Sequence, residues 1–515
     1  MAQVTFGGAR HEIMMTDRGF VQFGPVEAKQ PFAWSWITPN GADIDLVGSG
    51  LVYDAAGKAV AGKISEVQID IGNNNFLHPD ILIKGLAVDA WWLDNSPASF
   101  WSAVLGGNDQ IDARSLAQVA TSDRFPSVLF GDDLESAMGL DWAVVTDRGG
   151  NDTFLLGDAP YVVVGDVDSV LSDPSGTLFS NYQGGNDRIF ADPTYHEQQL
   201  AGDARLVSYD TVLRGGDDIL QFANTGVVAG DALFVGISSH ASASLIGGDD
   251  RLEAKAGSTA IIAGDVYIAN STDQIAGGDD TIYDSERANS LAGDLLFARA
   301  RATTVGGDDT IWGNEGSDLI SGDVLFAESS VIVGGRDTIH GGPGADLIWG
   351  ELGKPITGAF SVKGGNDLLY GDEGDDRIYG QTGDDQLYGG FDRDFLDGGP
   401  GNDLLDGGNE DDQLFGGAGK DRLRGGLGND KLTGGSEADI FEATGTFGRD
   451  QVLDFKNGTD KFDVDAGLTF KKLVITAADL DHDGKVDDIS IWLPGGTLEV
   501  LNTAKSAIDA GDFLF

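Results

Sequence analysis

Aspartate recurs every nine residues over a long stretch of this chain. From Gly371 to Glu442 the sequence divides into eight consecutive nine-residue units without a break in register, and two further units begin at Gly313 and Gly341. Each unit carries aspartate at its sixth position. These aspartates are Asp318, Asp346, Asp376, Asp385, Asp394, Asp403, Asp412, Asp421, Asp430 and Asp439. Carboxylates at a fixed spacing are ligands for a hard metal cation, so the pattern indicates metal binding.

Each unit combines a turn with a short strand. The first six residues are rich in glycine, which permits positive φ and a close approach of backbone carbonyl groups. The last three residues carry a large apolar side chain at position eight, which we expect to point into a thin core. Successive strands then wind into a right-handed parallel coil with two units per turn, and aspartates and carbonyl oxygens line up between turns. Calcium accepts six to eight such oxygen ligands, whereas magnesium demands stricter octahedral geometry.

The glycine-rich turn, the sixth-position aspartate and the apolar eighth residue together resemble the RTX (repeats-in-toxin) family of calcium-binding repeats. This resemblance implies an all-β fold built on a parallel β-roll, or β-solenoid, with several bound calcium ions. It also implies a bacterial protein that type I secretion machinery exports and that folds on meeting extracellular calcium. A glycine-rich elastic linker is the alternative, but a linker needs neither a constant phase nor fixed aspartates.

A longer period occupies the chain between residues 105 and 370. A Gly-Gly-x-Asp motif recurs there every 28 to 35 residues, and Gly-Asp or Gly-Glu pairs lie between its copies. We interpret each pair and the motif that follows it as one turn, split after its second position by an insertion. The sixth-position aspartates kept in this way are further candidate calcium ligands. They are Asp152, Asp187, Asp218, Asp250, Asp280, Asp309, Asp337 and Asp367.

The insertions in these opened turns have strand-like sequences. Val324–Ala327 and Val331–Val333 are apolar runs on either side of a polar turn, as expected of a hairpin. We therefore predict stacked hairpins that widen the solenoid between residues 131 and 365 and end where the regular units begin, at Gly371. Independent flexible loops are the alternative. A flat lateral face of this kind suits contact with a polysaccharide or with another copy of the chain.

The two ends of the chain lack the repeat. Residues 1–104 contain strand-like runs, and we expect a β-rich cap in which Trp91, Trp92 and Trp101 cover the first coil; a sugar-stacking platform is the alternative. Residues 443–515 resemble the closing segment of serralysin-like secreted proteins and end on an acidic residue followed by apolar ones, as uncleaved type I secretion signals do. The expected regions are 1–104, 105–370, 371–442 and 443–515.

A second kind of metal site is predicted near the C-terminus. Asp479, Asp481, Asp483 and Asp487 occupy positions one, three, five and nine of a loop that resembles an EF-hand calcium loop with glycine at position six. Ser490 stands at position twelve, where the bidentate glutamate is missing. A plain polar turn is the alternative.

Composition excludes several partners. The chain has 84 acidic and 33 basic residues and a formal net charge of −51, which repels nucleic acid. It has no cysteine, which excludes disulfides and thiolate metal sites. No apolar run is long enough to span a membrane, and the N-terminal residues lack the basic and apolar segments of a Sec-type signal peptide.

No catalytic motif stands out. His11 and Glu12 lack the second histidine of a zinc-protease HExxH motif, and no GxSxG nucleophile elbow is present. We therefore expect a secreted calcium-binding protein with a structural or adhesive role and no enzymatic activity. A polysaccharide-binding module, or an enzyme with an unrecognised N-terminal catalytic domain, are the alternatives.

Overall fold

A computed structural model of the chain consists almost entirely of β-strands. The structure describes residues 361–515 without a gap, residues 302–328 and 330–357, and, before residue 181, individual strands and residue 151. Between these parts it describes residues 181–191, 198–208, 212–222, 226–235, 244–255, 260–269, 274–285, 287 and 289–299. The chain divides into two compact units, Met1–Thr281 and Ile282–Phe515. The expected division into four regions stays a prediction.

The first unit begins with antiparallel strands. β1 (Thr5–Phe6) pairs with β2 (His11–Glu12), and a meander joins β3 to β6, which then pairs antiparallel with β7. The meander strands are β3 (Ala33–Ile37), β4 (Asp43–Tyr53), β5 (Ala59–Asp70) and β6 (Ile81–Asp89). The N-terminal part is therefore β-rich, as the sequence predicts, and the three tryptophans of the expected cap lie outside the described residues.

From β7 on, the first unit is a coil whose turns stack through four parallel sheets. The first sheet contains β7 (Gln110–Ala113), β10 (Thr153–Leu156), β14 (Arg188–Ala191), β18 (Ile219–Phe222) and β22 (Arg251–Ala254). The second contains β8 (Ser127–Phe130), β11 (Tyr161–Val164), β15 (Gln198–Ala201), β19 (Gly226–Ala229) and β23 (Ala260–Ala263). The third contains β12 (Val167–Leu171), β16 (Ala204–Ser208), β20 (Ala232–Val235) and β24 (Val266–Ala269). The fourth contains β9 (Thr146–Arg148), β13 (Asn181–Gln183), β17 (Val212–Arg214), β21 (Ser244–Ile246) and β25 (Gln274–Ala276).

The second unit, whose boundary with the first unit lies within strand β26 (Thr281–Tyr283), has the same four parallel sheets. Its first sheet contains β30 (Thr310–Trp312), β34 (Thr338–Pro343), β38 (Leu368–Glu373), β40 (Gln386–Phe391), β42 (Leu404–Asn409), β44 (Arg422–Leu427), β46 (Ile440–Ala443), β48 (Lys461–Val464) and β52 (Phe513–Leu514). Its second contains β27 (Ser290–Ala292), β31 (Leu319–Ser321), β35 (Leu347–Trp349), β39 (Arg377–Tyr379), β41 (Phe395–Pro400), β43 (Gln413–Ala418), β45 (Lys431–Ser436) and β47 (Arg449–Val452). Its third contains β28 (Leu295–Ala298), β32 (Val324–Glu328) and β36 (Leu352–Thr357), and its fourth β29 (Thr303–Val305), β33 (Val331–Val333) and β37 (Ser361–Lys363).

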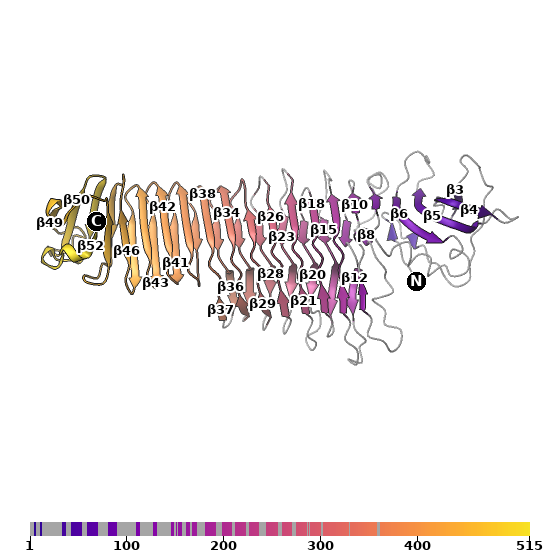
Figure 1. Cartoon of the computed structure of the whole chain (residues 1–515), viewed down its shortest axis with the longest axis horizontal. Coiled ribbons are helices and arrows are strands. Elements are labelled where there is room, and N and C mark those ends of the chain that lie inside the picture. The colour runs from indigo at the N-terminus through magenta and orange to yellow at the C-terminus, as the bar shows by residue number, and fades with distance from the viewer. Residues whose placement is uncertain are drawn as a thin grey trace. The chain divides into compact units, whose positions relative to one another are not determined.

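The third and fourth sheets are the predicted lateral extension. In the second unit they form a row beside the main stack that stops at β36 and β37, before the regular coils begin (Figure 1). Each insertion supplies one strand to each sheet, and these strands pair in parallel with their counterparts in the next coil, as Val331 does with Ser361. The extension is thus built by pairing between coils, not by pairing between the two strands of one insertion as a hairpin would require.

The regular coils contain two units each. Leu369 is in register with Leu387, and Leu387 with Leu405, so the coil repeats every 18 residues. The apolar residue at position eight of every unit is fully buried, which forms a core only one side chain thick per strand. These residues are Ile320, Ile348, Ile378, Leu387, Leu396, Leu405, Leu414, Leu423, Leu432 and Phe441.

The C-terminal end closes the coil with an antiparallel addition. β47 pairs in parallel with β51 (Gly496–Val500), and β51, β50 (Asp488–Leu493) and β49 (Val474–Ala478) form a meander. Short 3₁₀ helices lie at η3 (Phe470–Lys472), η4 (Lys505–Ala507) and η5 (Ala510–Asp512). Phe462 stacks on Phe455 and packs against Phe441 and Phe513. In the part of the chain that the structure describes, no helix has the length and apolar character needed to cross a bilayer.

Candidate metal centres

The sixth-position aspartates of the regular units form two ladders, one on each edge of the coil. In each ladder the backbone N–H of one aspartate donates to Oδ1 of the aspartate one coil further along. One ladder runs through Asp318, Asp346, Asp376, Asp394, Asp412 and Asp430, with N···O distances of 2.7–2.9 Å. The other runs through Asp309, Asp337, Asp367, Asp385, Asp403, Asp421 and Asp439, with N···O distances of 2.9–3.1 Å.

Both ladders continue beyond the last regular unit. Asp430 N–H donates to Asp450 at 3.3 Å, and Asp439 N–H donates to Asp460 at 3.2 Å. Every described sixth-position aspartate is buried, with no more than 3% of its surface exposed. Every predicted sixth-position residue that the structure describes in the second unit therefore lies in one of the two ladders, and Asp152 lies outside the described residues.

The second oxygen of each ladder carboxylate is left for another ligand. Oδ2 is buried and has no hydrogen-bond partner in every regular unit from Asp376 to Asp439. An ideal Cβ at Gly407 would lie 2.4 Å from Asp412 Oδ2 and 2.6 Å from the Gly425 carbonyl oxygen. Glycine is required at this position because carboxylate and carbonyl oxygens of two coils occupy the space beside it.

Burial in this arrangement disfavours the charged form of the carboxylates. Burial, together with repulsion from neighbouring aspartates, raises the pKa of Asp385 and of Asp394 to about 8 and that of Asp412 to about 9. Among the residues that the structure describes, no lysine, arginine or histidine forms an ion pair with a sixth-position aspartate from Asp376 to Asp439. A cation bound between coils would supply the missing positive charge.

The donor set fits calcium. Buried carboxylate oxygens without donors lie beside backbone carbonyl oxygens, and oxygen-only sites of high coordination number suit calcium. At each step of a ladder, the residues that would hold the ion are two successive aspartates and the glycine carbonyl groups beside them. When bound, calcium would neutralise these carboxylates and link one coil to the next.

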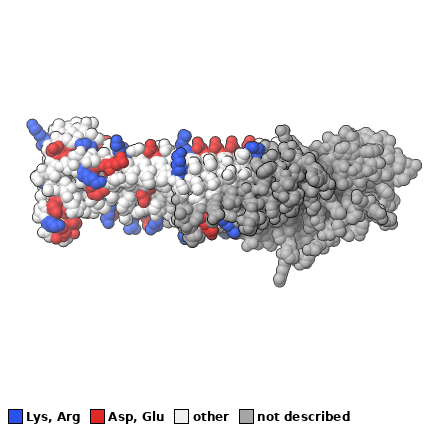
Figure 2. All heavy atoms as spheres, turned by 90° about the horizontal axis from the view of Figure 1, so that it is seen from below, with Lys and Arg blue, Asp and Glu red and all other residues white. Residues whose placement is uncertain are grey.

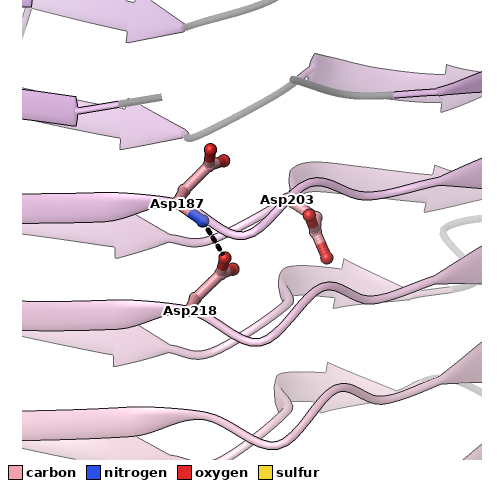
Figure 3. Close-up of side chains that lie close together, drawn as sticks. All are labelled: Asp187, Asp203 and Asp218. Carbon is pink, nitrogen blue, oxygen red and sulfur yellow. Dashed lines mark hydrogen bonds between the residues drawn. The ribbon is translucent and has the colours of Figure 1, made fainter. Parts of the chain in front are cut away.

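The opened coils of the first unit keep the ladder. Asp187 N–H donates to Asp218 Oδ1 at 2.6 Å (Figure 3), Asp218 N–H to Asp250 at 2.7 Å, and Asp250 N–H to Asp280 at 2.7 Å. The insertion therefore leaves the geometry of the sixth position intact. Figure 3 also shows Asp203 beside this ladder, and one carboxylate oxygen of Asp203 lies within 4.8 Å of one oxygen each of Asp187 and Asp218.

Asp203 belongs to a set of buried acids to which the sequence pattern gave no role. They are the acidic residues of the Gly-Asp and Gly-Glu pairs, and all are fully buried: Asp203, Asp231, Asp265, Asp294, Asp323 and Glu351. Asp203, Asp231 and Asp323 each accept from a backbone N–H of the next Gly-Gly-x-Asp motif, at 2.9, 3.2 and 2.9 Å. In the sequence, these acids recur at one position between successive Gly-Gly-x-Asp motifs. That recurrence could have indicated that they are ligands.

The predicted loop near the C-terminus is only partly assembled. Asp479, Asp481 and Asp483 each place a carboxylate oxygen within 4.8 Å of the others. Asp487 is not part of this group, and the Lys485 ammonium pairs with Asp483. His482 and Gly484 adopt positive φ of 61° and 85°, as a tight polar turn requires. The group is exposed at Asp481 and Asp483, so calcium binding there stays a prediction.

Exposed acids accompany the buried ones. Asp217 and Asp249 stand one position before their buried neighbours, and the N–H of Asp249 donates to Asp217 Oδ1 at 3.3 Å. Figure 2 shows a row of evenly spaced acidic side chains along one edge of the described part of the chain. Substitution of an exposed acid in this row can serve as a control for the same substitution at a buried aspartate.

Comparison with known proteins identifies the repeat. The family model for the RTX calcium-binding nonapeptide repeat matches residues 303–324, 333–354, 363–396, 388–423, 397–432, 406–441 and 415–450. No curated protein matches the chain. Among solved structures, the chain is similar at 11% identity to the extracellular lipase LipA from Serratia marcescens, over 96% of this chain and 83% of that one, with a TM-score of 0.15. That similarity is too low to support an argument.

Proposed function

We propose that this chain, whose residues 303–450 carry RTX repeats that bind several calcium ions, is a secreted protein that folds on extracellular calcium and then acts in adhesion or as a structural element. RTX repeats are typical of secreted proteins. The observation that carries the proposal is the pair of aspartate ladders, in which each regular coil leaves a buried carboxylate oxygen on each edge without a donor.

Calcium and folding are coupled through these carboxylates. The regular coils bury one large apolar side chain per unit, so their core is thin, while every unit also buries an aspartate. Stacked carboxylates repel one another unless they are protonated or bound to a cation. Because the site does not exist in the unfolded chain, the free energy of calcium binding becomes free energy of folding.

The same coupling supports export in an unfolded state. Calcium sites of extracellular modules have dissociation constants of about 10⁻⁴–10⁻³ M and stay empty in the cytosol. We propose that type I secretion machinery reads a signal within residues 443–515 before the coils form. In the folded chain Phe513 is almost fully buried against Phe462, so this residue is accessible only before folding.

The lateral extension supplies a face for contact. In the second unit, the first and last residues of β29, β33 and β37 include no carboxylate, in a chain with a net charge of −51. They are Thr303, Val305, Val331, Val333, Ser361 and Lys363. Val305 and Val331 are 45% and 44% exposed. A strip without carboxylates supports contact with a polymer or with another copy of the chain.

The aromatic side chains of the second unit favour a structural role over sugar stacking. Tyr283, Trp312, His340, Tyr370 and Tyr388 stack in sequence, with ring centroids 4.4, 6.2, 4.4 and 4.9 Å apart. The rings of Trp312, His340 and Tyr370 each have a stacked ring on both sides, so a sugar cannot stack on these three. We also propose no catalytic role for the described coils, because their acid clusters are enclosed and out of reach of a substrate.

The contact face is tested on the full chain in calcium. Val305→Asp and Val331→Asp together place two charges on the strip, and Leu427→Asp places one on the regular coils at a site that is 48% exposed. We expect the double variant to lose self-association in sedimentation velocity, or binding on a glycan array, and Leu427→Asp to retain both. Equal behaviour of the two variants and the parent would contradict the role of this face.

A further inference from the structure

Three groups of buried aspartates repeat along the opened coils of the first unit. They are Asp187–Asp203–Asp218, Asp218–Asp231–Asp250 and Asp250–Asp265–Asp280, and within each group the carboxylate oxygens lie within 4.8 Å of one another. The first group is drawn in Figure 3. Neighbouring groups share one aspartate, so the groups form a continuous file along the coil.

The central group shows what each position contributes. Asp218, Asp231 and Asp250 are 1%, 0% and 2% exposed. Asp218 Oδ2, Asp231 Oδ1 and Asp250 Oδ2 are all buried without a hydrogen-bond partner. The other oxygen of Asp231 accepts from Gly248 N–H at 3.2 Å, which holds the carboxylate in place. Each of the three aspartates therefore has a buried oxygen without a hydrogen-bond partner, and one carboxylate oxygen of each lies within 4.8 Å of the other two.

Backbone carbonyls complete an oxygen-only surrounding. An ideal Cβ at Gly230 would lie 1.7 Å from Asp250 Oδ2 and 2.0 Å from the Gly264 carbonyl oxygen. At Gly202 the same test gives 1.5 Å to Asp218 Oδ2 and 2.2 Å to the Gly230 carbonyl oxygen. Glycine at these places lets the carboxylates of one coil approach the carbonyl oxygens of the next.

The charge per coil differs in kind from that of the regular repeat. A regular coil has one ladder aspartate on each of its two edges, so the acids are far apart. An opened coil places two on the same edge: the step from Asp218 to Asp250 adds Asp231 and Asp250 to the file. One divalent cation per coil neutralises these two charges.

We propose that each of these opened coils binds one calcium-sized divalent cation between three aspartate carboxylates, as at Asp218, Asp231 and Asp250, and more tightly than the regular repeats bind calcium. The inference rests on the proposed calcium-binding function and adds a second class of site to it. A higher count of charged ligands in a rigid site raises calcium affinity, and a difference of about tenfold or more is expected.

Equilibrium calcium binding to the full chain tests the proposal. We expect a tight class of sites that saturates before the regular repeats. Asp231→Asn is expected to reduce the tight class by at least one ion and to leave the weak class unchanged. Asp217→Asn, an exposed acid beside Asp218, is expected to change neither class, and Asp412→Asn to affect only the weak class.

The possible results separate the two claims. A tight class that Asp231→Asn leaves unchanged, or the absence of any tight class while weak binding persists, would overturn the opened-coil sites and leave the proposed function standing. If the chain bound no calcium in either class, the proposed function itself would fail.

A second measurement separates a metal ligand from a structural side chain. Hydrogen exchange of residues 213–222 is compared between Asp231→Asn and the parent. In chelator the variant is expected to be better protected, because it removes a buried charge, and in calcium it is expected to be less protected. Lower protection of the variant in both conditions would show a purely structural role and overturn the proposal.

Discussion

The backbone N–H of Asp394 donates to Oδ1 of Asp412, one coil further along, at 2.8 Å, while Oδ2 of Asp412 is buried without a donor. One half of the carboxylate thus fixes the stacking of two coils, and the other half faces the Gly425 carbonyl oxygen. The same relationship repeats along both ladders. Stacking and metal binding therefore use the same side chain, which is why each is expected to favour the other.

Acid is expected to replace calcium in part. Burial raises the pKa of Asp385 and Asp394 to about 8 and of Asp412 to about 9, against about 3.9 in an unfolded chain. Protonated carboxylates favour the folded state below pH 4, and this stability is lost as the pH rises toward 9. In chelator, far-UV circular dichroism should therefore show β-structure increasing as the pH falls from 9 to 4.

Calcium is expected to reverse this trend, because it binds the deprotonated carboxylates. Calcium affinity measured between pH 6 and 9 should rise with pH. An affinity that fell over this range, or a chelated chain that lost β-structure on acidification, would contradict the assignment of these aspartates as ligands.

Gly407→Ala is expected to disrupt a calcium site. The new Cβ would lie 2.4 Å from Asp412 Oδ2, so the carboxylate must move away from the Gly425 carbonyl oxygen. Overpacking of this kind costs about 1–3 kcal/mol before the loss of the ion is counted. We expect a lower melting temperature in calcium and fewer bound ions by equilibrium dialysis.

Gly458→Ala is the matched control for Gly407→Ala. Gly458 has φ of 78° and nothing within 4 Å of its ideal Cβ, so the substitution strains the backbone without touching a ladder. It should lower the melting temperature slightly and leave the number of bound calcium ions unchanged. If both variants retained the full number of ions, the proposed glycine-lined sites would be wrong.

Leu414→Ala is expected to destabilise the regular coils strongly. Leu414 is fully buried in a core one side chain thick, and removing such a side chain costs about 2–5 kcal/mol. Leu427→Ala makes the same chemical change at a site that is 48% exposed, and is expected to change stability by about 0.5 kcal/mol or less. Urea unfolding in calcium measures both, and equal losses would show that position eight is not the core.

Much of the fold can be predicted from the constant nine-residue spacing of the repeat. A sixth-position aspartate and an eighth-position apolar residue that recur together can stack only if coils repeat every second unit, and Leu387 and Asp394 lie as this requires. The extension was predictable because an insertion that leaves and rejoins the coil at neighbouring points must double back. Pairing between the insertions of neighbouring coils was also predictable from their stacking. The lack of pairing within one described insertion was not, because two apolar runs around a polar turn are also the pattern of a hairpin.

The acids of the Gly-Asp and Gly-Glu pairs in the opened coils were not predicted as ligands from the sequence. Gly230 and Asp231 occupy positions one and two of a split turn. Because position two of the regular unit is usually glycine, the sequence pattern assigns no ligand role to this position. Only the three-dimensional path brings Asp231 next to Asp218 and Asp250, which are 13 and 19 residues away along the chain. Local spacing could not reveal a site whose ligands come from different halves of a split turn.

Secretion is expected to depend on the C-terminal segment. A chain that lacks residues 456–515 should stay in cells that express a type I system, since it lacks the proposed signal. Deletion of residues 389–406 removes one 18-residue coil and keeps the C-terminal segment, so this variant should still be exported. Immunoblots of cells and medium measure both, and export of the first variant would place the signal elsewhere.

Hydrogen exchange of the full chain tests the central claim, calcium-coupled folding, most directly. Peptides from residues 371–442 are followed by mass spectrometry in millimolar calcium and after exhaustive chelation, both at pH 9, which is at or above the raised pKa values of Asp385, Asp394 and Asp412. We predict strong protection of the strand amides in calcium and exchange close to that of an unfolded chain in chelator. Protection that survived complete removal of calcium would contradict the account.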